Sequence, residues 1–353
     1  MLTWWQCTGA ADFIPWYSAT AISCARRNNA IILAVDYPLG PEGNYADIHA
    51  ALEDFLRWYK EDGCFEVGYH DWRKWLYAQN TGKSFTIDKD HVYVEGESAG
   101  GLAAVMALWI NADRRRGMDI PVKFALLRYP MIAHYSRVWP TITDENPTGA
   151  VIYMGTSVPK EKFQRDMESV KEVILRLEKY NLVPTCAGRP PPIGMAFAVL
   201  LSVTQEWQAF FQRQHGATQL KPSPDTRDKT ILDGIQRAEM CAQDTVDPNL
   251  LPRMRIYHGH DDPNCPLQNT EKFVELLRDP KLYGDRFKTG DSITLDVVTE
   301  LKEKKWWDAE RKELIFGCST TVAHGFDYYL DEASEPFLKR AYNHVESHWG
   351  RKV

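Results

Sequence analysis

The sequence predicts an α/β protein with a mostly parallel sheet, for two reasons. Four short apolar runs have the length and β-branched content of buried strands, namely residues 30–35, 91–95, 122–127 and 254–258. Helical patterns lie between the early runs: residues 45–59 place their apolar side chains on one face, and residues 99–112 are small and apolar enough for a buried helix. Strands that alternate with helices favour a parallel sheet.

The domain organisation follows from a change of pattern in the middle of the chain. The 353 residues suffice for one large α/β domain or two ordinary ones. From about residue 134 to 251 the periodicity becomes helical, and no strand is predicted there. We therefore expect a single domain over residues 1–353, with a helical cap inserted at about residues 134–251.

Two helices are predicted within this cap. Residues 160–180 have the pattern of a charged amphipathic helix, and residues 197–214 that of a more apolar one. Trp207 and Phe211 stand one helical turn apart in the second helix. We predict that they line a substrate pocket, although aromatic side chains more often fill cores.

Composition excludes several classes of protein. A formal charge of -6 provides no general basic field, so nucleic acid is not expected as a partner. The apolar runs are shorter than the roughly 20 residues that span a bilayer. Residues 1–6 do not resemble a secretory signal, and the 7 cysteines are scattered without a C-x-x-C pair. These features predict a cytoplasmic protein with reduced thiols, no structural zinc site and no cofactor. They do not indicate the oligomeric state.

A sharp glycine-rich turn is the first feature that points to chemistry. Gly96-Glu97-Ser98-Ala99-Gly100 follows a predicted strand and opens a predicted helix. Glycines on both sides of the serine allow backbone to pass close by, while the hydroxyl projects from the end of the sheet. This context favours a nucleophilic Ser98 over an ordinary Gly/Ser turn.

A serine hydroxyl needs a base to take its proton and a third group to hold that base in one tautomer. His324 is the candidate base; it stands in Ala323-His324-Gly325-Phe326-Asp327, late in the chain and just before the last amphipathic helix. The candidate acid is Asp262, which follows the strand at residues 254–258 and is favoured over Asp261. Adjacent aspartates before a proline also commonly cap turns. His258 and His260, which flank this loop, are not predicted to bind a metal.

Four segments in order, residues 35–42, 96–101, 258–266 and 324–327, are similar to motifs of one family. The motifs are D-Y-R-L-A-P-E, G-[DE]-S-A-G-G, H-G-x-x-D-x-x-V-P and H-G-F. Together they resemble the hormone-sensitive-lipase-like branch of the α/β-hydrolase fold, a group of carboxylesterases and lipases. In the third pattern the acid corresponds to Asp262. The branch more often carries its acid in a D-P-L-x-D loop, and the segments around the acid are longer here.

The resemblance implies a chemistry. Ser98, Asp262 and His324 follow the serine, acid, histidine order of the fold, and the backbone N–H of Ala99 would bind the oxyanion. The function so predicted is hydrolysis of a small-molecule carboxylic ester through an acyl-serine. Two alternatives stay open: a catalytically impaired homologue that binds a small molecule, and an amidase or peptidase on the same fold.

The largest departure from the family lies at the N-terminus. The H-G-G-G loop that supplies the second oxyanion donor falls by spacing at residues 1–4 and is absent there. The strand that precedes this loop would lie upstream of Met1. We expect a truncated chain, with a gap between the strands at residues 30–35 and 91–95. Alternatively, Gly9 or a neighbour supplies the donor.

Overall fold

The structure is a computed structural model, and it describes residues 2–4, 18–38, 40, 43, 45–61, 88–132, 151–153, 156–180, 197–198, 201, 245–262, 264–301, 322, 324–327 and 330–350. A six-stranded sheet has the order β2-β1-β3-β4-β7-β8, and every neighbouring pair is parallel. Its strands are β1 (Leu2–Trp4), β2 (Leu33–Ala34), β3 (Val92–Glu97), β4 (Val122–Arg128), β7 (Arg253–Gly259) and β8 (Ile293–Val298). The predicted α/β class with a parallel sheet is confirmed.

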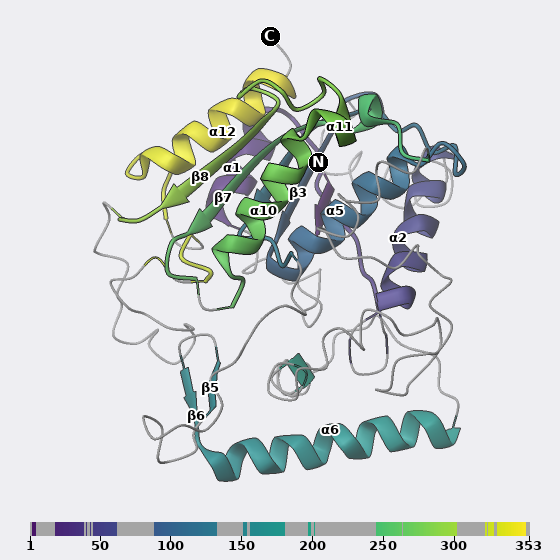
Figure 1. Cartoon of the computed structure of the whole chain (residues 1–353), viewed down its shortest axis with the longest axis vertical. Coiled ribbons are helices and arrows are strands. Elements are labelled where there is room, and N and C mark those ends of the chain that lie inside the picture. The colour runs from purple at the N-terminus through teal and green to yellow at the C-terminus, as the bar shows by residue number, and fades with distance from the viewer. Residues whose placement is uncertain are drawn as a thin grey trace, which may run out of the picture.

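Helices cover both faces of this sheet (Figure 1). On one face lie α2 (Tyr45–Lys60), α5 (Ser98–Ala112) and α10 (Leu267–Arg278), followed by the short α11 (Pro280–Tyr283). On the other lie α1 (Ala19–Arg27) and α12 (Pro336–His348). A 3₁₀ turn, Pro248–Leu250, precedes β7.

Strand β4 shows how the sequence divides the core between these two faces. Ala125 and Leu127 belong to the cluster with α2, α5 and α10, whereas Phe124 and Leu126 belong to the cluster with α1 and α12. Successive side chains of a strand point to opposite faces, so an apolar residue at every position suits a strand that is covered on both sides. Strand β4 therefore contributes side chains to the hydrophobic core on each face of the sheet.

The expected gap in the sheet is filled by β1. Leu2 pairs with Leu33 of β2 and with Val94 of β3, both in parallel register. The prediction of a gap between these two strands is therefore wrong. Three residues are too few to show a strand pattern in the sequence, yet they offer backbone N–H and C=O groups to two neighbours.

Three predicted helices match the structure, whereas α1, α10 and α11 were not predicted, and the strands show two further exceptions. The helices predicted at residues 45–59, 99–112 and 160–180 correspond to α2, α5 and α6 (Lys160–Tyr180). Strand β8 was not predicted, because Thr294 and Asp296 interrupt its apolar residues. This pattern is typical of an edge strand that is buried less than its neighbours.

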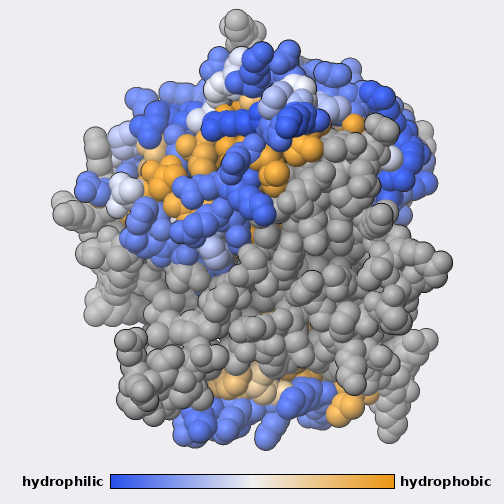
Figure 2. Space-filling model, viewed as in Figure 1, coloured by the Kyte–Doolittle hydropathy of each residue, from blue (hydrophilic) through white to orange (hydrophobic). Residues whose placement is uncertain are grey.

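The second exception lies in the predicted cap. The prediction of no strand there is wrong, because β5 (Val151–Tyr153) and β6 (Thr156–Val158) form an antiparallel pair. This pair and α6 lie apart from the large sheet (Figure 1). In Figure 2 the outer side of α6 is hydrophilic, while Met167 and Val170 are buried. The boundaries of a cap and the single-domain organisation stay predictions.

Within the described ranges, no helix combines the length and the apolar character that a membrane crossing requires.

Gly259, at the end of β7, lets another segment approach closely. A Cβ atom there would lie 2.2 Å from the carbonyl oxygen of Val322, which precedes His324 by two residues. Since backbone rather than a flexible side chain occupies this space, the two segments would have to separate to admit a methyl group. The glycine thus brings the segment that precedes His324 against the end of β7.

We predict that Gly259→Ala lowers the free energy of unfolding by about 1–3 kcal/mol, the usual range for overpacking. Gly290→Ala is the matched control, because no atom lies within 4 Å of a Cβ placed there. It should change stability by less than about 0.5 kcal/mol. Chemical denaturation of both variants tests this, and equal midpoints would contradict it.

Candidate active site

Ser98 occupies a strained turn between β3 and α5. Its φ is +50°, a value that residues other than glycine rarely adopt. The glycines around it make the turn sterically possible: a Cβ on Gly96 would lie 2.3 Å from the carbonyl oxygen of Gly100, and one on Gly101 would lie 2.7 Å from Cβ of Pro130. The local sequence therefore folds into a strand-to-helix elbow with the serine at its corner.

Three of the predicted site residues lie together in one hydrogen-bonded chain. Oγ of Ser98 lies 2.9 Å from Nε2 of His324, and Nδ1 of His324 lies 2.8 Å from Oδ2 of Asp262. Because an ionised carboxylate only accepts hydrogen bonds, Nδ1 carries the proton, and Nε2 of the neutral ring is free to accept from the serine. All three residues are buried.

The surroundings of Asp261 and Asp262 differ, and they bear on which of the two can act as the acid. Asp261 is exposed, and its carboxylate contacts Nδ1 of His260 at 2.8 Å. Asp262 is buried, and its Oδ1 accepts backbone N–H bonds from Asn264 and Cys265 at 2.8 and 2.9 Å. These bonds leave Oδ2 directed at His324. Of the two aspartates, Asp262 is the one that contacts His324.

Electrostatics favour an anionic Asp262 beside a basic His324. Burial alone would raise the pKa of Asp262, but the His324 charge and hydrogen bonds from His258 and His324 hold that pKa below its usual range. Burial alone would lower the pKa of His324, but the Asp262 charge raises it well above its usual value. The pair therefore binds a proton on the imidazole readily.

Other predicted site residues are placed only in part. Ala99 follows Ser98 in the first turn of α5 and is buried, where its backbone N–H is one of the free donors at the helix start. Trp207 and Phe211 lie outside the described residues, as does Gly9, the alternative source of a second oxyanion donor.

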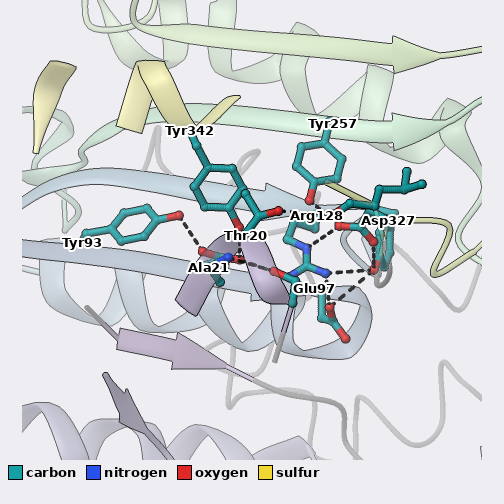
Figure 3. Close-up of polar contacts among 12 residues, drawn as sticks. Thr20, Ala21, Tyr93, Glu97, Arg128, Tyr257, Asp327 and Tyr342 are labelled. Atoms are coloured by element: carbon teal, nitrogen blue, oxygen red, sulfur yellow. Dashed lines mark hydrogen bonds and ion pairs between the residues drawn. The ribbon is translucent and has the colours of Figure 1, made fainter. Parts of the chain in front are cut away.

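Sequence reasoning missed a buried ion cluster behind this site (Figure 3). Arg128, at the end of β4, is 2% exposed, and its guanidinium pairs with Glu95 at 3.1 Å, Glu97 at 2.7 Å and Asp327 at 2.9 Å. Four tyrosine hydroxyls contact the carboxylates of this Arg128 cluster: Tyr93 and Tyr342 on Glu95, Tyr129 on Glu97 and Asp327, and Tyr257 on Asp327. An arginine directly after an apolar strand was the available signal.

The Arg128 cluster connects the elbow to the histidine segment. Glu97 immediately precedes Ser98, and Asp327 follows His324 by three residues. The ring of Tyr129 packs edge-on against the imidazole of His324, with centroids 4.8 Å apart, while its hydroxyl donates to Asp327 at 2.7 Å. One set of buried ion pairs thus positions both the residue before Ser98 and the segment after His324.

The comparisons with known proteins agree with this architecture. Residues 9–165 match the family model described as alpha/beta hydrolase fold. The chain has the α/β-hydrolase fold. The resemblance drawn from four motifs to the hormone-sensitive-lipase-like branch of this fold is confirmed. No curated protein sequence matches the chain.

Several solved structures resemble this chain at low identity. An esterase from Pyrobaculum calidifontis is 15% identical, with a TM-score of 0.47, over 98% of this chain and 75% of that one. Carboxyl esterase 2 from Tuber melanosporum is 14% identical, with a TM-score of 0.47, over 98% and 78%. A Staphylococcus aureus protein of unknown function is 10% identical, with a TM-score of 0.48, over 99% and 89%.

We predict that Arg128→Met destabilises the protein by about 3–5 kcal/mol, because three buried carboxylates lose their cation. The matched control is Arg57→Met, which removes an arginine whose side chain is 54% exposed and pairs with Glu53 on the same helix. The control substitution should lower the free energy of unfolding by about 0.5 kcal/mol or less. Thermal unfolding of the two variants tests this. An Arg128→Met protein as stable as the control would show that the ion pairs contribute little.

Proposed function

We propose that this protein is a serine hydrolase that cleaves carboxylic esters of small molecules through an acyl-serine intermediate. The observation that carries the proposal is the hydrogen-bonded chain from Ser98 through His324 to Asp262 at a strained elbow. Both distances fall within the range that proton transfer requires. The resemblance of four motifs to a branch of carboxylesterases and lipases supports the ester as the substrate class.

The proposed reaction has two halves. Oγ of Ser98 attacks the ester carbonyl and forms the C–O bond, while Nε2 of His324 accepts the hydroxyl proton. The tetrahedral intermediate collapses, the alcohol leaves with that proton, and the acyl group stays on the serine. Water then attacks the acyl-enzyme, again with His324 as base, and releases the carboxylic acid and the free serine.

Two groups support these steps without forming bonds to the substrate. The carboxylate of Asp262 holds the imidazole in its tautomer and stabilises the imidazolium that forms in each half. The backbone N–H of Ala99 donates to the oxyanion of each tetrahedral intermediate.

Among described residues the free thiols of Cys24 and Cys265 support the proposal of a reducing, cytoplasmic location.

A catalytically impaired protein that only binds a small molecule is the alternative function. A short-chain aryl ester separates the two functions. A hydrolase releases a rapid burst of aryl alcohol equal to the concentration of enzyme, or a steady turnover that Ser98→Ala abolishes. A binding protein releases none above the uncatalysed rate.

Exchange of the acid tests its assignment. Asp262→Asn should lower turnover of an aryl ester by roughly 10⁴-fold, because the amide favours the wrong imidazole tautomer. The matched control is the exposed neighbour, and Asp261→Asn should leave turnover within a few fold. The opposite ranking would transfer the role to Asp261.

The pH dependence tests the same pair independently. His324 must be neutral to accept the serine proton, so kcat/KM should rise with pH through the His324 pKa. The Asp262 anion raises that pKa. Removing the anion in Asp262→Asn should therefore shift the acid limb of the residual activity to lower pH. A limb that stays in place or moves to higher pH would contradict this electrostatic account.

A further inference from the structure

The acid loop, residues 258–266, carries Asp262 and contains one residue that departs from the family motif in a chemically important way. In H-G-x-x-D-x-x-V-P the residue before the proline is valine, and here it is Cys265. This thiol is free and 2% exposed. Its own backbone N–H donates to Asp262 at 2.9 Å, and its carbonyl oxygen accepts from Nε2 of His258 at 2.8 Å. The loop therefore holds the sulfur in a defined place.

That place is beside the acid and the base. A carboxylate oxygen of Asp262, the sulfur of Cys265 and a ring nitrogen of His324 all lie within 4.8 Å of one another, and all three residues are buried. Thiolate sulfur, imidazole nitrogen and carboxylate oxygen are the three ligand types that Zn²⁺ uses in proteins. A valine at residue 265 would leave only two ligands, too few for a defined site.

We propose that Asp262, Cys265 and His324 form an inhibitory site for a thiophilic divalent cation, in particular Zn²⁺. The site is distinct from the metal ligation considered for His258 and His260, since His258 bonds to the Cys265 carbonyl and to Thr270. Its inhibitory effect rests on the proposed hydrolase function, whereas binding of the metal does not.

The ligand geometry requires a small movement. Bonds of about 2.0 Å in a tetrahedral site place nitrogen and oxygen ligands roughly 3.3 Å apart, whereas Nδ1 of His324 and Oδ2 of Asp262 are 2.8 Å apart. The hydrogen bond between them must open slightly, and its proton must leave. A second proton leaves the thiol. The thiolate and the carboxylate then balance the charge of the cation, so binding strengthens as pH rises.

Inhibition follows from the tautomer of the histidine. A cation on Nδ1 takes the place of the proton there, so the neutral ring carries its one proton on Nε2. That nitrogen can then no longer accept the hydroxyl proton of Ser98. Mg²⁺ and Ca²⁺ prefer sites made of oxygen ligands and should not compete.

Binding is tested with Co²⁺ as the probe, because a cobalt–thiolate bond gives a charge-transfer absorption in the near ultraviolet. The full chain is titrated as wild type, as Cys265→Val, which restores the family residue, and as Cys265→Ser. Cys24→Ser is the matched control, since Cys24 is the other described buried free thiol. The absorption should appear in the wild type and the control, and Zn²⁺ should displace it. Both Cys265 variants should lack it.

Inhibition is measured on the same four proteins. Zn²⁺ should suppress aryl-ester turnover in the wild type and in Cys24→Ser, and the half-inhibitory concentration should rise roughly tenfold or more in both Cys265 variants. Mg²⁺ should have no effect on any of them.

Several results would overturn the inference: no thiolate absorption in the wild type, absorption that survives in the Cys265 variants, or equal inhibition of all four proteins. Because the cobalt titration needs no turnover, a chain that binds Co²⁺ through Cys265 but hydrolyses no ester would refute the proposed function while leaving the metal site supported.

Discussion

The pairing of the Arg128 guanidinium with Glu95, Glu97 and Asp327 is the interaction on which the arrangement of the site depends. A buried charge without a partner is strongly unfavourable, so each of these groups restricts where the others can lie. Three carboxylates face one cation, and the tyrosine hydroxyls supply the remaining donors. The segment before Ser98 and the segment after His324 are therefore coupled electrostatically as well as by packing.

The parallel sheet explains why residues so distant in sequence meet at all. Ser98 and His324 are 226 residues apart, and Asp262 lies 62 residues before the histidine. Ser98 follows β3 and Asp262 follows β7, and the carboxyl ends of parallel strands lie along one edge of a sheet. Strand β4 lies between these two and ends in Arg128. One edge thus carries the elbow, the acid loop and the ion cluster that joins them.

Much of this was predictable from local chemistry. Gly96 and Gly101 are forced by close backbone approaches, and an elbow of this kind has a recognisable sequence. Helices α2, α5 and α6 have apolar patterns long enough to be read directly. Strand β1 is too short for such a pattern, and β8 has polar residues among its apolar ones. Arg128 and Cys265 escaped prediction because their importance depends on partners that only the tertiary structure brings close.

The central claim is that Ser98 becomes covalently acylated, and peptide mass spectrometry tests it most directly. The chain is mixed with an aryl ester, quenched in acid within the first turnover and digested. We expect one added acyl group, on the peptide that contains Ser98 and absent from Ser98→Ala. An aryl ester that is hydrolysed with no adduct on Ser98, or an adduct that persists in the Ser98→Ala chain, would contradict the account.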